Sequence, residues 1–113
     1  MIRLLRKLFE TPGAETDPAD WATRFCAHQG LAALASLLLL GVMPANGAVP
    51  LLLASYALWE AAQYLRQRGW LLAWDCVLDW CAWAAMVLAI AWWPLPGALA
   101  SAAILSVGIW RRS

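Results

Sequence analysis

Acidic and amide side chains interrupt two apolar stretches in the middle of the sequence, at positions 56–83. Glu60 and Gln63 are three residues apart, and Asp75 and Asp79 are four apart, so each pair shares one face of a helix. Acids are rare in segments that cross a bilayer, and those that occur usually face a bundle interior and mark a function. Together with a histidine they could hold a divalent cation, polarise a phosphate-bearing substrate, or act as general acid and base.

A polar stripe in an earlier apolar stretch supplies the histidine. Asp20, Arg24 and His28 recur every four residues, which is the spacing of one helix face. Arg66 and Arg68 occupy the short turn between the two stretches that carry the acids. We therefore predict one polar pocket formed by His28, Glu60, Gln63, Arg68, Asp75 and Asp79, with Asp20, Arg24 and Arg66 in support and Glu60, Asp75 and Asp79 as ligands of any divalent cation.

A purely structural role would use the same residues. Glu60 or Asp75 could pair with Arg24 or Arg68 in an internal network that fixes helix packing. The sequence shows no Gly-rich phosphate-binding loop and no Ser/His/Asp nucleophile set, so whether the protein is an enzyme stays open. Its basic residues are dispersed rather than clustered in a patch, which argues against a nucleic-acid partner.

The composition predicts a membrane protein of one domain. Of the 113 residues, 64% are hydrophobic and only 13% are charged, and nine are tryptophan, a residue that favours the membrane–water interface. The three cysteines are odd in number and lack a ligand-like spacing, so we interpret them as free apolar residues rather than a disulfide framework or a zinc site.

The apolar segments predict an all-α integral membrane bundle of four transmembrane helices. We expect a membrane domain over 17–113, with spans near 18–43, 48–66, 70–93 and 95–110. Asp17 followed by Pro18 is typical of a helix start. Small residues recur every four positions in the last span, a spacing that lets another helix pack closely and is compatible with a homo-oligomer; they are Ala98, Ala102 and Ser106.

The first 16 residues form a separate segment. Met1–Glu10 is amphipathic at helical spacing, with apolar residues on one side and charged residues on the other. It is too charged to cross a bilayer, so we predict an interfacial helix on an anionic leaflet, followed by a linker at 11–16. A frayed basic tail is the alternative.

Loop charges predict the orientation. All eight basic residues fall on one side of a four-span arrangement: Arg3, Arg6, Lys7, Arg24, Arg66, Arg68, Arg111 and Arg112. The positive-inside rule then places both termini in the cytoplasm, in the cytoplasmic membrane of a bacterium, with membrane lipids as the surrounding partners. The candidate pocket residues all belong to the cytoplasmic half of the spans.

The same residues resemble a known family. A histidine early in the first span, E-x-x-Q near the end of the second, an arginine turn, and an Asp–x–x–x–Asp/Asn step in the third are similar to the VanZ-like group of small bacterial membrane proteins. YjdF-type proteins have a similar W-D-x-x-x-D step. The resemblance implies a helical integral membrane protein, linked in some members to glycopeptide tolerance, and it carries no catalytic mechanism. The matching positions are His28, Glu60, Gln63, Arg68, Trp74, Asp75 and Asp79.

Two other function classes suit these features. A short chain with several spans and charged termini is also typical of a phage holin or another small pore-forming or exclusion protein, in which intramembrane acids would line a lumen or control assembly. A lipid phosphoryl-transfer enzyme is the second alternative, because D-x-x-x-D on a membrane helix could bind magnesium. We favour a VanZ-like protein that binds an amphiphilic or anionic envelope component, or a cation, through the polar pocket.

Overall fold

Four helices make up the described part of the chain. The computed structural model describes residues 17–67 and 70–113. The helices are α2 (Pro18–Leu40), α3 (Ala45–Gln67), α4 (Trp70–Ala91) and α5 (Pro94–Arg112). The predicted all-α class is confirmed for these residues, which contain no strand. The predicted amphipathic helix at 1–10 lies outside the described residues.

Local chemistry accounts for the helix ends. The side chain of Asp17 accepts hydrogen bonds from the backbone N–H of Ala19 at 2.8 Å and of Asp20 at 3.0 Å, which caps α2. The carbonyl of Pro44 accepts from the N–H of Ala48 at 3.0 Å, so α3 begins ahead of Pro50 rather than after it. Pro50 lies inside the second turn of α3, where its nitrogen has no hydrogen to donate to the helix.

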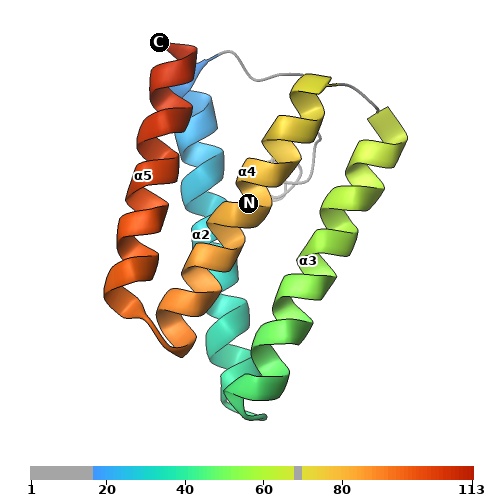
Figure 1. Ribbon diagram of the computed structural model, residues 1–113, viewed down its shortest axis with the longest axis vertical. Coiled ribbons are helices and arrows are strands. Elements are labelled where there is room, and N and C mark those ends of the chain that lie inside the picture. Colours follow the sequence, from blue (N-terminus) through green and yellow to red (C-terminus); the bar gives the residue numbers. More distant parts are fainter. Residues whose placement is uncertain (1–16, 68–69) are drawn as a thin grey trace, which may run out of the picture.

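The helices run alternately up and down, and α2 and α4 form the centre of the bundle. Each of these two contacts all three other helices, while α3 and α5 lie on opposite sides of them (Figure 1). One end of the bundle therefore holds the start of α2, the end of α3, the start of α4 and the end of α5. We call it the Arg112 end. The connections at 41–44 and 92–93 lie at the opposite end.

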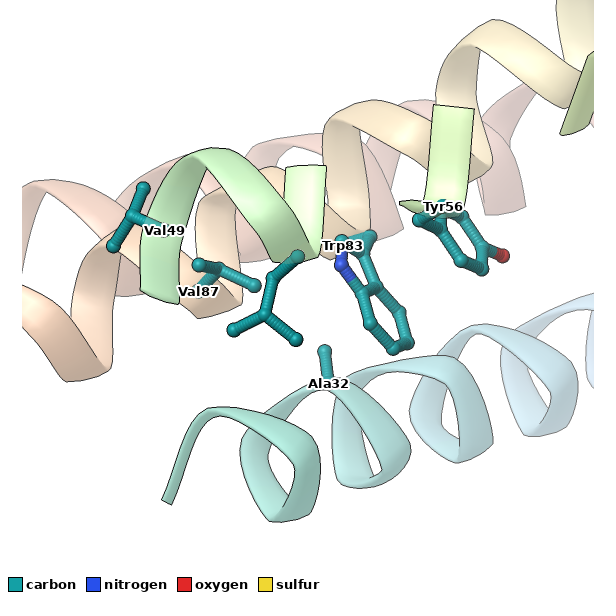
Figure 2. Packing of buried hydrophobic residues seen from close by; sticks show 6 residues of the cluster. Ala32, Val49, Tyr56, Trp83 and Val87 are labelled. Atoms are coloured by element: carbon teal, nitrogen blue, oxygen red, sulfur yellow. The ribbon is translucent and has the colours of Figure 1, made fainter. Parts of the chain in front are cut away.

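An apolar core joins α2, α3 and α4. Tyr56 and Trp83 stack almost parallel, with ring centroids 4.3 Å apart and planes inclined by 3°. The rest of the cluster continues along the bundle, as Figure 2 shows, and consists of Ala32, Val49, Leu52 and Val87.

A glutamine fixes α5 to the central pair. Gln29 is buried, and its Nε2 donates to the carbonyl of Ala82 on α4 at 2.6 Å. The hydroxyl of Ser101 on α5 donates to Gln29 Oε1 at 3.3 Å. One side chain of α2 therefore connects three helices, in a region where an unmet polar group would be costly.

The surface of the bundle is apolar while part of its interior is polar. Val42, Leu58 and Trp110 are 80%, 72% and 78% exposed, whereas the exposed fractions of Ser36 and Glu60 are only 0% and 5%. Within the described residues two helical segments, Pro18–Leu40 and Ala73–Ala91, are long and apolar enough to cross a membrane. The other two helices are less apolar, because α3 carries polar residues near both ends and α5 carries prolines at its start and arginines at its end.

Candidate functional site

His28 and Asp79 face each other across the central helix pair. His28 Nδ1 of α2 lies 3.8 Å from Asp79 Oδ1 of α4, and the two side chains are 21% and 28% exposed. This separation is within the range of an ion pair and too long for a hydrogen bond. His28 is ten residues from the start of α2 and Asp79 nine from the start of α4, so both lie roughly 15 Å from the Arg112 end.

Glu60 of α3 lies next to this pair. Its side chain is 5% exposed, and its charge interacts with those of His28 and Asp79. Tyr56 precedes Glu60 by one turn on the same face, and its ring makes an edge-on contact with His28, with centroids 6.2 Å apart. We call His28, Tyr56, Glu60 and Asp79 the polar cluster.

Three buried polar atoms of this cluster make no hydrogen bond to the rest of the described chain. They are His28 Nδ1, Tyr56 Oη and Glu60 Oε2. Each unmet buried group costs about 1–3 kcal/mol, and native proteins rarely leave several of them together. The polar cluster therefore has unused hydrogen-bonding capacity at these three atoms.

Asp75 belongs to a different contact. Its Oδ1 accepts a hydrogen bond from Arg112 Nη2 at 2.9 Å, and the side chains of Asp75 and Arg112 are 26% and 10% exposed. Arg112 also donates to the carbonyl of Gly108 at 3.2 Å, and its guanidinium lies 4.7 Å from the ring centroid of Trp21. We call Trp21, Asp75, Gly108 and Arg112 the α5 clasp, because they hold the end of α5 against α2 and α4.

The predicted partners of the acids differ from those observed. In the structural alternative, Glu60 or Asp75 would pair with Arg24 or Arg68; the observed partner of Asp75 is Arg112, which entered the sequence analysis only as a loop charge. Among the described residues no group of three or more His, Cys, Asp or Glu side chains is placed to hold a metal ion. Asp75 pairs with Arg112 of α5 while Asp79 faces His28 of α2, and a cation held by Glu60, Asp75 and Asp79 stays a prediction.

The remaining candidates lie nearer the Arg112 end. Gln63 is half-buried one turn beyond Glu60, and Arg24 is half-buried one turn before His28. Asp20 and Arg66 are exposed. Arg68 lies outside the described residues.

A groove between α3 and α4 borders the polar cluster. It has a volume of about 330 Å³, and its walls include Ala57, Glu60, Ala61, Cys76, Val77 and Trp80. Trp80 is fixed in place because its Nε1 donates to the carbonyl of Leu53 at 3.1 Å. The groove opens to the outside of the bundle between α3 and α4. The His28–Asp79 pair lies between α2 and α4, on the other side of Glu60.

Sequence reasoning missed Tyr56, Trp21 and Arg112. Tyr56 has a readable signal, because it stands four residues before Glu60 and so shares its face. Trp21 and Arg112 have none, since their contact joins positions at opposite ends of the described chain.

No protein-family model, curated protein or solved structure matches the chain. A carboxyl, a phenol and an imidazole with unmet hydrogen-bonding capacity, beside an apolar groove, can bind the polar group of an amphiphile and exchange protons with it.

Proposed function

We propose that the chain is a VanZ-like multi-pass protein of the bacterial cytoplasmic membrane that binds an envelope amphiphile through the polar cluster. The observation that carries this proposal is the set of unmet polar atoms on His28, Tyr56 and Glu60, buried together in an apolar bundle. Polar groups inside a membrane bundle are costly to insert, so their retention without partners points to a ligand.

The exposed side chains support a position in the bilayer. Large apolar residues cover the outside of all four helices, including Leu34, Leu58, Val77 and Leu99, which are 54%, 72%, 51% and 62% exposed. Water would penalise such a surface, and lipid would not. Two helical segments of the described chain also meet the length and hydropathy of a span, and we propose that α3 and α5 cross beside them.

The basic residues support the orientation. Arg24, Arg66, Arg111 and Arg112 all lie toward the Arg112 end of the bundle (Figure 1). This end then faces the cytoplasm by the positive-inside rule. Reporter fusions after Asn46 and Pro96 should be periplasmic, and a fusion after Ser113 should be cytoplasmic. A periplasmic reporter at Ser113 would overturn the four-span arrangement.

The geometry supports binding over phosphoryl transfer. Two carboxylates on one helix could share a magnesium ion only if they faced the same space, whereas Asp75 pairs with Arg112 and Asp79 faces His28. A ligand with hydrogen-bond donors and acceptors suits the polar cluster without a metal.

The test compares the polar cluster with an exposed control in a bacterium that expresses the chain. Glu60→Gln and Asp79→Asn should leave membrane insertion unchanged and abolish any altered tolerance to wall-directed antibiotics. Asp20→Asn is the matched control, because Asp20 is exposed and lies outside the cluster; it should behave as the unchanged chain. Abrupt lysis or dye influx that persists in the Glu60→Gln, Asp79→Asn double variant would refute the proposal and favour a holin-type pore.

A further inference from the structure

The α3–α4 groove has apolar walls and contains one buried acid. Ala57 and Ala61 project from α3 into one wall, and Val77 and Trp80 of α4 form the other. Among the described residues, Glu60 is the single charged residue that lines it. The groove thus has the two chemistries that an amphiphile needs, a surface for its chain and a group for its head.

We propose that this groove binds a single-chain amphiphile with an amine headgroup, which enters sideways from the bilayer and donates hydrogen bonds to Glu60. The inference rests on the proposed function and names the ligand class for the same site.

The dimensions and lining of the groove suit one alkyl chain. Its volume of about 330 Å³ is at the lower end of the range for small-molecule sites. At roughly 30 Å³ for each group the size of a water molecule, that space holds a chain of about ten carbons. The small side chains of Ala57 and Ala61, both exposed on α3, leave room that a larger residue would fill.

The acid selects the headgroup. Glu60 is 5% exposed, and its Oε2 has no hydrogen-bond partner among the described residues. A carboxylate accepts hydrogen bonds, and a protonated amine provides them with a charge that strengthens each bond. Asp79 lies close enough for its charge to interact with Glu60, which adds to the attraction for a cation and repels an anionic head.

The experiment uses the full chain in phosphatidylcholine nanodiscs. Dodecylamine with a photoreactive diazirine in its chain is compared with the equivalent dodecanoic acid, both at the same mole fraction in the membrane. After irradiation, mass spectrometry identifies the labelled residues. The amine should label α3 and α4 at the groove, unlabelled dodecylamine should compete, and the acid should label the groove about tenfold less.

Three variants test the two halves of the site. Ala61→Leu fills the groove, and Glu60→Gln removes the charge while keeping the shape. Each should weaken amine labelling about tenfold. Ala62→Leu is the matched control, because Ala62 is also an exposed alanine of α3 and does not line the groove; its labelling should equal that of the unchanged chain. Labelling that is spread evenly over the outward faces, or that survives Ala61→Leu or Glu60→Gln, would overturn the inference.

Asp79→Asn separates this inference from the proposed function, since Asp79 does not line the groove. If Asp79→Asn keeps the antibiotic phenotype while groove labelling still requires Glu60, the proposed function fails and the amine site stands. If Asp79→Asn abolishes the phenotype while labelling is unspecific, the amine site fails and the proposed function stands.

Discussion

Asp75 and Asp79 lie one turn apart on α4 in opposite surroundings. Asp75 faces α5, where a guanidinium sits 2.9 Å from its Oδ1 and in turn covers the ring of Trp21. Asp79 faces α2, where the imidazole of His28 is 3.8 Å away and shares its space with the buried carboxyl of Glu60. The α5 clasp is a closed set of contacts, whereas the polar cluster leaves hydrogen-bonding atoms unmet.

This difference separates a structural contact from the proposed binding site within one helix. A buried ion pair can hold helices in register when the other hydrogen bonds of its two groups are also satisfied. Breaking the pair leaves one buried charge without a partner. Buried polar atoms without hydrogen bonds do not stabilise the fold. Replacing them should leave the free energy of unfolding of the ligand-free protein unchanged or raise it. Substitutions in the α5 clasp should therefore destabilise the bundle more than substitutions in the polar cluster.

The tightest contact of the α5 clasp should be the most sensitive. A Cβ added at Gly108 would overlap the ring of Trp21, so α5 can approach α2 only through a glycine. We expect Gly108→Leu to lower the free energy of unfolding by about 3 kcal/mol, the upper end for overpacking. Denaturation in mixed micelles measures it. Gly30→Leu is the control, since nothing lies within 4 Å of a Cβ there, and equal losses in both variants would contradict the close approach.

The ion pair should come next. Asp75→Asn and Arg112→Gln should each cost about 1–3 kcal/mol of unfolding free energy, because each leaves the other half-buried partner without its counter-charge. In a double-mutant cycle the two losses should not add, since the second change removes a group whose ion pair is already broken. Strict additivity would mean that Asp75 and Arg112 stabilise the bundle independently.

The same contrast of bonded and unmet groups recurs at two tryptophans of α4. Trp80 Nε1 donates to the carbonyl of Leu53 at 3.1 Å, whereas Trp83 Nε1 is buried and finds no hydrogen-bond partner in the described chain. Replacing each with benzothienylalanine, which has sulfur in place of the N–H, should cost about 1 kcal/mol at Trp80 and nothing at Trp83. Thermal unfolding of the two semisynthetic proteins would show it, and a larger loss at Trp83 would reverse the assignment.

The polar cluster should show the smallest effect on stability. Glu60→Gln and Asp79→Asn should each cost less than Asp75→Asn, about 0.5 kcal/mol or less, because Glu60 Oε2 makes no hydrogen bond within the described chain and Asp79 lies 3.8 Å from His28, beyond hydrogen-bond length. The same micelle denaturation measures this change. A loss as large as that of Asp75→Asn would show that the cluster is a packing network rather than a binding site.

Sequence reasoning predicted the all-α fold because long apolar stretches bounded by Asp17-Pro18, Pro44 and Pro94 leave few other solutions. It also grouped His28, Glu60 and Asp79, because intramembrane acids and histidines are rare. These three side chains do lie near one another in the bundle, and their role as a functional site stays a prediction.

That Asp75 and Asp79 contact different helices could not be predicted from the sequence. A spacing of four residues turns a helix by about 40° more than a full circle, which sequence patterns treat as one face. In α4, which contacts three helices, that rotation is enough to send Asp75 toward α5 and Asp79 toward α2. Which neighbour each side chain meets depends on helix packing over long sequence separations, and Arg112 is 37 positions from Asp75.

The Gln29 bridge has a consequence for biogenesis. During synthesis α2 is made first and Ser101 on α5 much later. Gln29 Oε1 therefore has no hydrogen bond from Ser101 until α5 has been synthesised. A nascent chain halted after α4 would display this amide at the face that α5 later covers. Such a product would leave two polar groups without their α5 partners, the amide of Gln29 and the carboxyl of Asp75.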